Sequence, residues 1–473
     1  MRKVLLYICS VFILGGMTSC EDFLDKREDV GLTEDDIFRD YYSLRGFLDQ
    51  SFNQLENVMV MDNWENGRAF VGLFADEMAT TDNSSAVFTL HSGNWLSNAK
   101  SNKTFEIGNA GSTAISRSYK ALRINNRIIN DIDKAPLTPE QKNEILGQAY
   151  FYRSWFYFQV IKRYGGMPII DKVFEGGDDD IPRMTYHESH DWMMEDIQKA
   201  IYMLPDSWDD PNYGRPTKIA AMALKEWAQL FDASPLMQND LNSTENKGYD
   251  TERAKSAAKS AYEVIRYMDG SKSAPYPYGL ASKEEYTNVF YFKYPPVHQP
   301  EYIWVKRQFP NAANQNQKRT IRTFWQYEDL AFGSGPDGNS MCCPSLNIVN
   351  MFDKKGADGI YYPIDDPRSG YALDYDHKPF EDRDPRFYNN ILLPGTTWGH
   401  YADGRTYYIT TYKGGAAYQH MLTQKTATNE CSQDLCVKSS CGRNAISILK
   451  RTIRTVGGTI ASSPYISVLR KFI

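Results

Sequence analysis

Apolar residues recur at helical spacing through the first 270 residues of this 473-residue chain. The clearest set follows at intervals of four, three, four and four residues and consists of Ile145, Ala149, Tyr152, Phe156 and Val160. This spacing places all five side chains on one face of a helix. We therefore predict a helix with an aromatic-rich apolar stripe that packs against the core.

Both ends of this helix carry recognisable signals. Thr138 and Gln141 have the spacing of a capping box, and Pro139 suits the first helical position. Gly165 and Gly166 follow the last apolar turn, where glycine commonly ends a helix. The sequence therefore predicts a helix that stops abruptly at the glycine pair, after which the chain returns as an extended segment.

Helical spacing continues in segments on either side of this helix. They are Ile115 to Ile129, Met193 to Leu204 behind a Thr185/Glu188 capping box, Ala220 to Leu224 behind Gly214-Arg215-Pro216-Thr217, and Ala254 to Ile265. Their small residues allow neighbouring helices to approach closely, as in helical-repeat proteins. No clean repeat period connects them, so the pattern alone predicts antiparallel helix pairs over about residues 34–270.

The pattern changes after about residue 275. Glycine and proline interrupt the chain, helical periodicity fades, and short strands such as Tyr302 to Val305 are predicted. Of the 146 residues from 275 to 420, 28 are aromatic, which is about 19% against 14% for the whole chain. We predict an irregular, aromatic-rich ligand region here, in one continuous domain with the helices.

The N-terminus reads as an export signal. Arg2-Lys3 precedes the apolar run Val4 to Leu14, which is too short to span a bilayer but suits a signal peptide over residues 1–19. Met17-Thr18-Ser19-Cys20 resembles a lipobox, and Glu21-Asp22 resembles a surface-export signal. We expect lipidation at Cys20 and anchoring through several acyl chains. The alternative is a secreted protein with an incidental Cys20.

The last fifty residues differ from the rest of the chain. Residues 425–473 contain eight basic and two acidic residues, whereas the remainder contains 45 basic and 57 acidic residues. We interpret this atypical tail as the result of a frameshift or truncation. A divergent but folded C-terminus is the alternative.

No enzymatic constellation stands out. The net charge of -6 offers no footprint for nucleic acid. Gly333 to Gly338 matches GxGxxG as text, but no strand precedes it and no helix follows. The seven histidines show no HExxH spacing, and the seven cysteines indicate neither a zinc site nor a disulfide framework. We expect a protein without catalysis, cofactor or metal.

Several short strings stand out along the chain: Gly147-Gln148-Ala149, Arg153-Ser154, Tyr157-Phe158, Tyr164 to Pro168, Cys343 to Asn347 with Met351-Phe352, and Arg383 to Phe387. Together they resemble the signatures of the SusD/RagB family, outer-membrane nutrient-binding lipoproteins of Bacteroidota. Gln148 and Ser154 depart from the family's commonest residues, and the family's usual C-terminal ending is missing. In the Arg383 to Phe387 string we expect the arginines and the aspartate to pair and fix a loop.

The resemblance covers about residues 20–424 and implies a mostly α fold, the SusD-like α-α superhelix with tetratricopeptide-like helix pairs. It also implies a surface-exposed lipoprotein of the outer membrane that captures glycans for a SusC-like TonB-dependent transporter. A binding protein for peptide or another non-glycan nutrient is the alternative, and a surface glycoside hydrolase is disfavoured by the missing motifs.

Glycan binding directs attention to loop aromatics beside polar residues. Sugar rings present apolar CH faces that stack on aromatic rings, while polar neighbours bind their hydroxyls. The candidates are Asn94, Trp95, Trp325, Tyr327 and Trp398. By contrast Trp155, Trp192 and Trp304 are predicted to be core residues, because they lie in helical stripes or in an apolar strand.

Overall fold

Long helices dominate the computed structural model of the chain. The structure describes residues 33–55, 78–80, 114–174, 180–238, 248–273, 277–282, 300–306, 342–371, 379–391, 393, 397–400 and 406–408. The helices are α3 (Glu34–Phe38), α4 (Tyr41–Asn53), α7 (Ala114–Asp131), α8 (Pro139–Tyr164), α9 (Tyr186–Met203), α10 (Lys218–Asp232), α11 (Thr251–Gly270), α14 (Leu346–Met351) and α15 (Pro385–Asn390). Short 3-10 turns are η3 (Ile132–Lys134), η4 (Asp210–Asn212), η5 (Pro235–Met237), η6 (Ser271–Ser273) and η8 (Pro367–Ser369).

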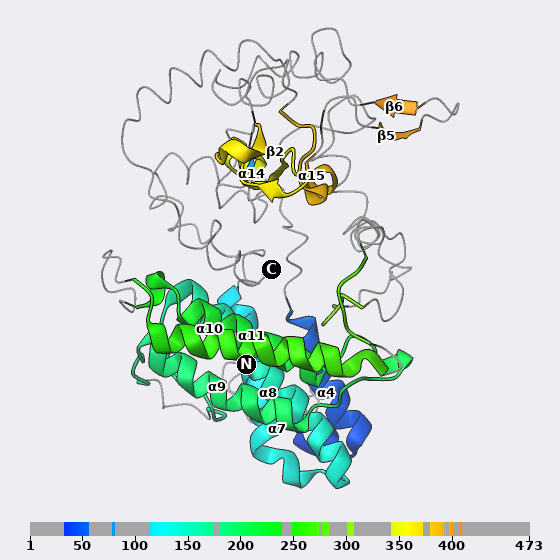
Figure 1. Ribbon diagram of the computed structural model, residues 1–473. Helices are drawn as coiled ribbons and strands as arrows, with labels where there is room; N and C mark the ends of the chain where they lie inside the picture. The colour runs from blue at the N-terminus through cyan, green and yellow to red at the C-terminus, as the bar shows by residue number, and fades with distance from the viewer. Residues whose placement is uncertain are drawn as a thin grey trace, which may run out of the picture.

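The strands of the described residues form three small antiparallel sheets. β1 (Met78–Thr80) pairs with β2 (Cys342–Pro344), β3 (Lys354–Lys355) with β4 (Tyr361–Tyr362), and β5 (Thr397–His400) with β6 (Thr406–Tyr408). Figure 1 shows α14, α15 and β2 grouped together, apart from the row of long helices. The mostly α fold class that the sequence predicts is confirmed.

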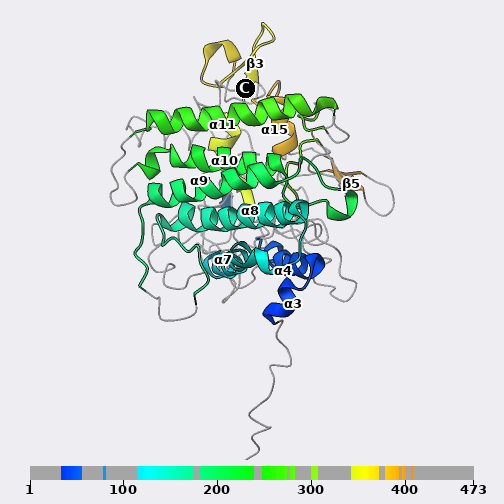
Figure 2. The ribbon, with the colours of Figure 1, turned by 90° about the horizontal axis from the view of Figure 1, so that it is seen from below.

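The long helices lie side by side in chain order. Figure 2 shows α7, α8, α9, α10 and α11 as successive layers, with α4 beside α7. Each helix packs mainly on its neighbour in the sequence, α7 on α8, α8 on α9, α9 on α10 and α10 on α11. This is the arrangement of a helical-repeat protein, in which each element contacts its neighbours.

Helix α8 forms as its sequence signals require. The Thr138 hydroxyl accepts from the Gln141 amide at 3.3 Å, and the Gln141 side chain accepts from the Thr138 amide at 3.0 Å. At the other end Gly165 has a positive φ of 78° and its amide donates to the Ile161 carbonyl. The predicted capping box and glycine stop are both confirmed.

The apolar stripe of α8 is only part of what the helix buries. All five stripe residues are buried, and so are Phe151, Tyr157 and Phe158 on other faces. Neighbouring helices cover opposite sides of α8, because α7 and α9 both pack against it. It is therefore a central helix rather than a surface helix with one buried face.

The extended return after α8 is held against α9. The Ser189 hydroxyl bonds to both the amide and the carbonyl of Met167, at 3.0 and 3.2 Å. The Tyr157 hydroxyl donates to the carbonyls of Met167 and Pro168. Gly166 lies against the backbone that leads into α9. A Cβ added to this glycine would stand 2.1 Å from the Met184 carbonyl oxygen. Gly165 thus ends the helix, whereas Gly166 is required by the close approach of the two backbones.

The string around Arg383 fixes a loop, in part as predicted. Arg386 pairs with Asp384 at 2.7 Å, as expected. Arg383 instead donates to the backbone carbonyls of Val349 and Phe352 at 2.6 and 2.7 Å. Its guanidinium lies over the Phe387 ring. The first arginine therefore satisfies the C-terminal carbonyls of α14, a role that helix ends commonly need.

One predicted strand is wrong. Residues 302 to 305 form no strand, although their short apolar run suggested one. A strand requires a hydrogen-bonded partner, and this segment instead lies along the helical stack, where Ile303 and Trp304 pack on the main core. The Trp304 indole donates a hydrogen bond to Gly214, in the connection between α9 and α10. The backbone of the segment pairs with no strand.

Some sequence predictions fall outside the described residues. These are the signal peptide, the lipidation site Cys20 and the atypical tail 425–473. Within the described part of the chain, no helix combines the length and apolar character needed to cross a bilayer.

Candidate functional site

The predicted glycan contacts are almost all untested by the structure. Asn94, Trp95, Trp325 and Tyr327 lie outside the described residues. Trp398 lies in strand β5, at the point where the pairing with β6 shifts register between Thr397 and Gly399. The role of these five residues as glycan contacts therefore stays a prediction.

The described residues do form one aromatic cleft that the sequence did not indicate. It lies between the connection of α9 to α10, the segment 277–278 and the segment 302–305. The side chains that give it its character are Trp208, Tyr213, Arg215, Tyr278, Tyr302 and Trp304. Aromatic walls with a few polar groups are typical of small-molecule sites.

Two indole hydrogen bonds join the walls of the cleft. The Trp208 indole donates to the Pro216 carbonyl at 2.9 Å, which folds the α9–α10 connection onto itself. The Trp304 indole donates to the Gly214 carbonyl at 3.0 Å, across 90 residues of sequence. Gly214 has a φ of 99°, which glycine adopts readily, so this turn presents its carbonyl without strain.

Trp304 connects the cleft to the core. Its ring packs edge-on against Phe151 and Trp155 of α8, with centroids 4.9 Å apart in both cases. Trp304 is only partly buried, and it also lines the cleft. Trp304 therefore packs on the core, as predicted, and also forms part of the cleft wall. Its contacts with the aromatic rings of α8 hold its ring in place.

Arg215 supplies the cleft's charge and is already paired. Its two terminal nitrogens donate to both carboxylate oxygens of Asp49 at 2.7 and 2.8 Å. One of them also donates to the Gln148 side chain at 3.0 Å. A bidentate pair of this kind is strong and geometrically fixed. These contacts join the turn before α10 to α4 and α8. They also occupy both terminal nitrogens of Arg215 with partners inside the protein.

Two tyrosines of the cleft, Tyr278 and Tyr302, are neutral. Burial raises the pKa of Tyr278 and Tyr302 above that of a free phenol. Both hydroxyl groups are therefore protonated at physiological pH and can donate as well as accept hydrogen bonds. Such groups suit the hydroxyls of a sugar.

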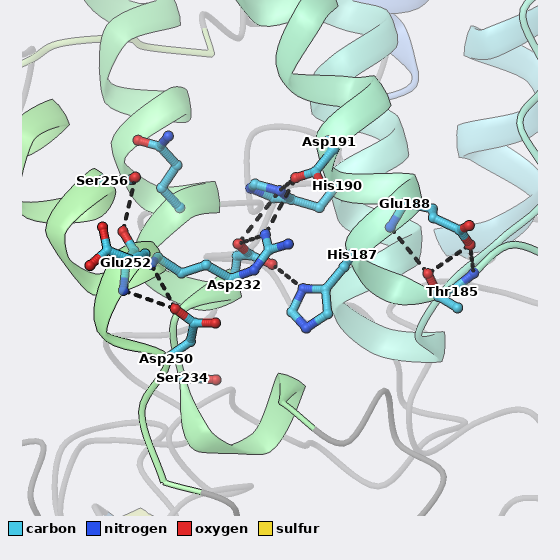
Figure 3. A network of polar contacts seen from close by, with 12 residues as sticks. Thr185, His187, Glu188, His190, Asp191, Asp232, Ser234, Asp250, Glu252 and Ser256 are labelled. Atoms are coloured by element: carbon cyan, nitrogen blue, oxygen red, sulfur yellow. Dashed lines mark hydrogen bonds and ion pairs between the residues drawn. The ribbon is translucent and has the colours of Figure 1, made fainter.

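A second polar cluster joins three helices and is shown in Figure 3. Asp232 is the last residue of α10, and its side chain is 2% exposed. Its carboxylate forms an ion pair with Arg253 of α11. His187 of α9 lies 2.8 Å from the same carboxylate through Nδ1. His190 lies between Asp191 and Asp232, at 3.0 and 3.6 Å.

This cluster has a structural explanation. A carboxylate at a helix C-terminus meets the negative end of the helix dipole, so buried Asp232 requires cationic or donor partners. Arg253 and the two histidines provide them from the adjoining helices. Among the residues that the structure describes, no group of three or more histidine, cysteine or acidic side chains is arranged to hold a metal ion.

Sequence reasoning missed the cleft because the residues of its walls are far apart along the chain. Trp208 and Tyr213 flank the Gly214-Arg215 turn, but Trp304 stands 90 residues later. The signal in the sequence was the clustering of aromatic residues around the Gly214-Arg215 turn. The connection between α9 and α10, which contains this turn, shows no apolar periodicity.

The stacked helix pairs define a helical-repeat protein. The family described as "Starch-binding associating with outer membrane" matches residues 22–226, and the SusD family matches residues 300–435. The chain belongs to the SusD/RagB family, as the motif resemblance indicates.

One relative, described as SusD-like protein P38 of Formosa agariphila, is 28% identical over 102 residues. That alignment covers 21% of this chain and 20% of the relative, so it spans about a fifth of that protein.

Solved structures share the fold. A SusD-like protein from Bacteroides fragilis superposes with a TM-score of 0.55 at 20% identity, covering 80% of this chain and 66% of that one. A SusD-like carbohydrate binding protein from the same organism gives a TM-score of 0.53 at 17% identity, covering 78% and 62%. At these identities the likeness concerns the fold.

Proposed function

We propose that the protein is a cell-surface, lipid-anchored glycan-binding protein that captures oligosaccharides or polysaccharides without cleaving them. The observation that carries the proposal is the match of residues 22–226, which include most of the helical stack, to a family described as starch-binding and associating with the outer membrane, together with the match of residues 300–435 to the SusD family. The carbohydrate-binding title of a structural neighbour supports the same class of ligand.

The chemistry of the described cleft is consistent with such a ligand. Partly buried tryptophan and tyrosine side chains line it, and its tyrosine hydroxyls are neutral hydrogen-bonding groups. Rings held by core packing lose little freedom when a ligand stacks on them, which favours binding. The predicted contacts Asn94, Trp95, Trp325, Tyr327 and Trp398 would add further aromatic and polar surface.

Delivery and location complete the proposal. Lipidation at Cys20 would hold the protein at the outer membrane, facing outward. There it would pass captured glycan to a SusC-like TonB-dependent transporter. Anchoring by several acyl chains leaves the folded part free to work at the surface.

Affinity electrophoresis tests the binding role. The purified protein runs through native gels that contain starch, β-glucan, galactomannan or xylan, and circular dichroism checks that it is folded. We expect retardation by at least one glycan, reduced by Trp95→Ala, Trp325→Ala or Trp398→Ala. Trp227→Ala is the matched control, because Trp227 is a partly exposed tryptophan on α10 that does not line the cleft.

A folded protein that no glycan retards would overturn the proposal. Retention of a peptide mixture by that same protein would then favour uptake of a non-glycan nutrient. Release of reducing sugar from a retained polysaccharide would contradict the non-catalytic part.

A further inference from the structure

We draw no further inference here: the strongest candidate, the surface of α10 and α11 that exposes Trp227, Leu230 and Ile265, is an apolar patch for which nothing in the described part of the chain shows what covers it.

Discussion

Arg153 of α8 and Asp196 of α9 form a buried, two-pronged ion pair. The Arg153 Nε and a terminal nitrogen donate to the two Asp196 oxygens at 2.6 and 2.9 Å. The second terminal nitrogen donates to Asn126 of α7 at 3.0 Å. The side chains of the pair are 5% and 2% exposed. One arginine therefore connects three successive helices in a buried part of the stack.

Removing one member of this pair should be costly. Arg153→Met leaves the Asp196 carboxylate buried beside Lys199 alone, and we expect a loss of about 3–5 kcal/mol in the free energy of unfolding. Urea denaturation followed by circular dichroism measures it. Lys272→Ala is the control, because its pair with Asp269 is exposed on both sides, and the change should stay within about 0.5 kcal/mol.

A companion variant separates charge burial from packing. Arg153→Met combined with Asp196→Leu removes both charges, so it should be less destabilised than the single Arg153→Met variant. Equal losses in the single and double variants would show that the arginine acts mainly through its packing.

Gly166 should not accept a side chain. A Cβ there would stand 2.1 Å from the Met184 carbonyl oxygen, a backbone atom that cannot move without displacing the start of α9. We expect Gly166→Ala to lower the thermal midpoint by several degrees, the effect of a loss of about 2 kcal/mol or more.

Gly46→Ala is the matched control for this prediction. It lies inside α4 with nothing within 4 Å of the new methyl group. Alanine favours a helix over glycine by about 1 kcal/mol, so the control should be stabilised. A Gly166→Ala protein as stable as the parent would contradict the close contact.

The two arginines near α15 should differ sharply. Arg383 is 1% exposed and satisfies backbone carbonyls at the end of α14, so Arg383→Ala leaves buried acceptors unpaired. We expect a loss of about 2–4 kcal/mol for the part of the fold around α14 and α15. The Arg386 side chain is 55% exposed, and Arg386→Ala should cost about 0–1 kcal/mol.

Limited proteolysis reads this local stability directly, because cleavage follows opening of the segment. The Arg383→Ala protein should be cut faster between α14 and α15 than the parent. Equal cleavage rates for both alanine variants would argue against the carbonyl-binding role of Arg383.

Asp191 should contribute stability that depends on pH. Its hydrogen bond with His190, followed by that with Arg253, lowers the pKa of Asp191 from 3.8 to about 2. Between these values the unfolded chain binds more protons than the folded one. The stabilisation is therefore present above about pH 4 and is lost as the pH falls through 2.

Asp191→Asn tests this dependence. The side chain is 62% exposed, so solvent screening limits its contribution to about 1 kcal/mol or less. The variant should be less stable than the parent at pH 6, and the difference should shrink as the pH falls from 4 to 2 in urea titrations. A difference that is the same at both pH values would contradict ionisation of Asp191 as the cause.

Sequence periodicity was sufficient for the helices because their information is local. Apolar spacing, Thr138 with Gln141, and Gly165 together specify where α8 begins, which way it faces and where it ends. Each of these signals acts within about one helical turn, so a single sequence contains it. The same holds for the Thr185–Glu188 box that begins α9.

The sequence misled where a local pattern needed a distant partner. Residues 302 to 305 are a short apolar run like that of a buried strand, yet in the described structure they lie along the helical stack. Such a run shows that its residues are buried but not which element buries them. The Trp304 bond to Gly214 settled this segment, and it joins positions 90 residues apart.

What the sequence alone determined is the helical scaffold, its caps and stops, and the family motifs that lie on them. What only the tertiary structure decided is which side chains meet: Arg153 with Asp196, Arg215 with Asp49, and Trp208 with Trp304 across the cleft. The physical reason is range. Backbone conformation responds to near neighbours in the chain, whereas a binding cleft and a buried ion pair are made by residues that only packing brings together.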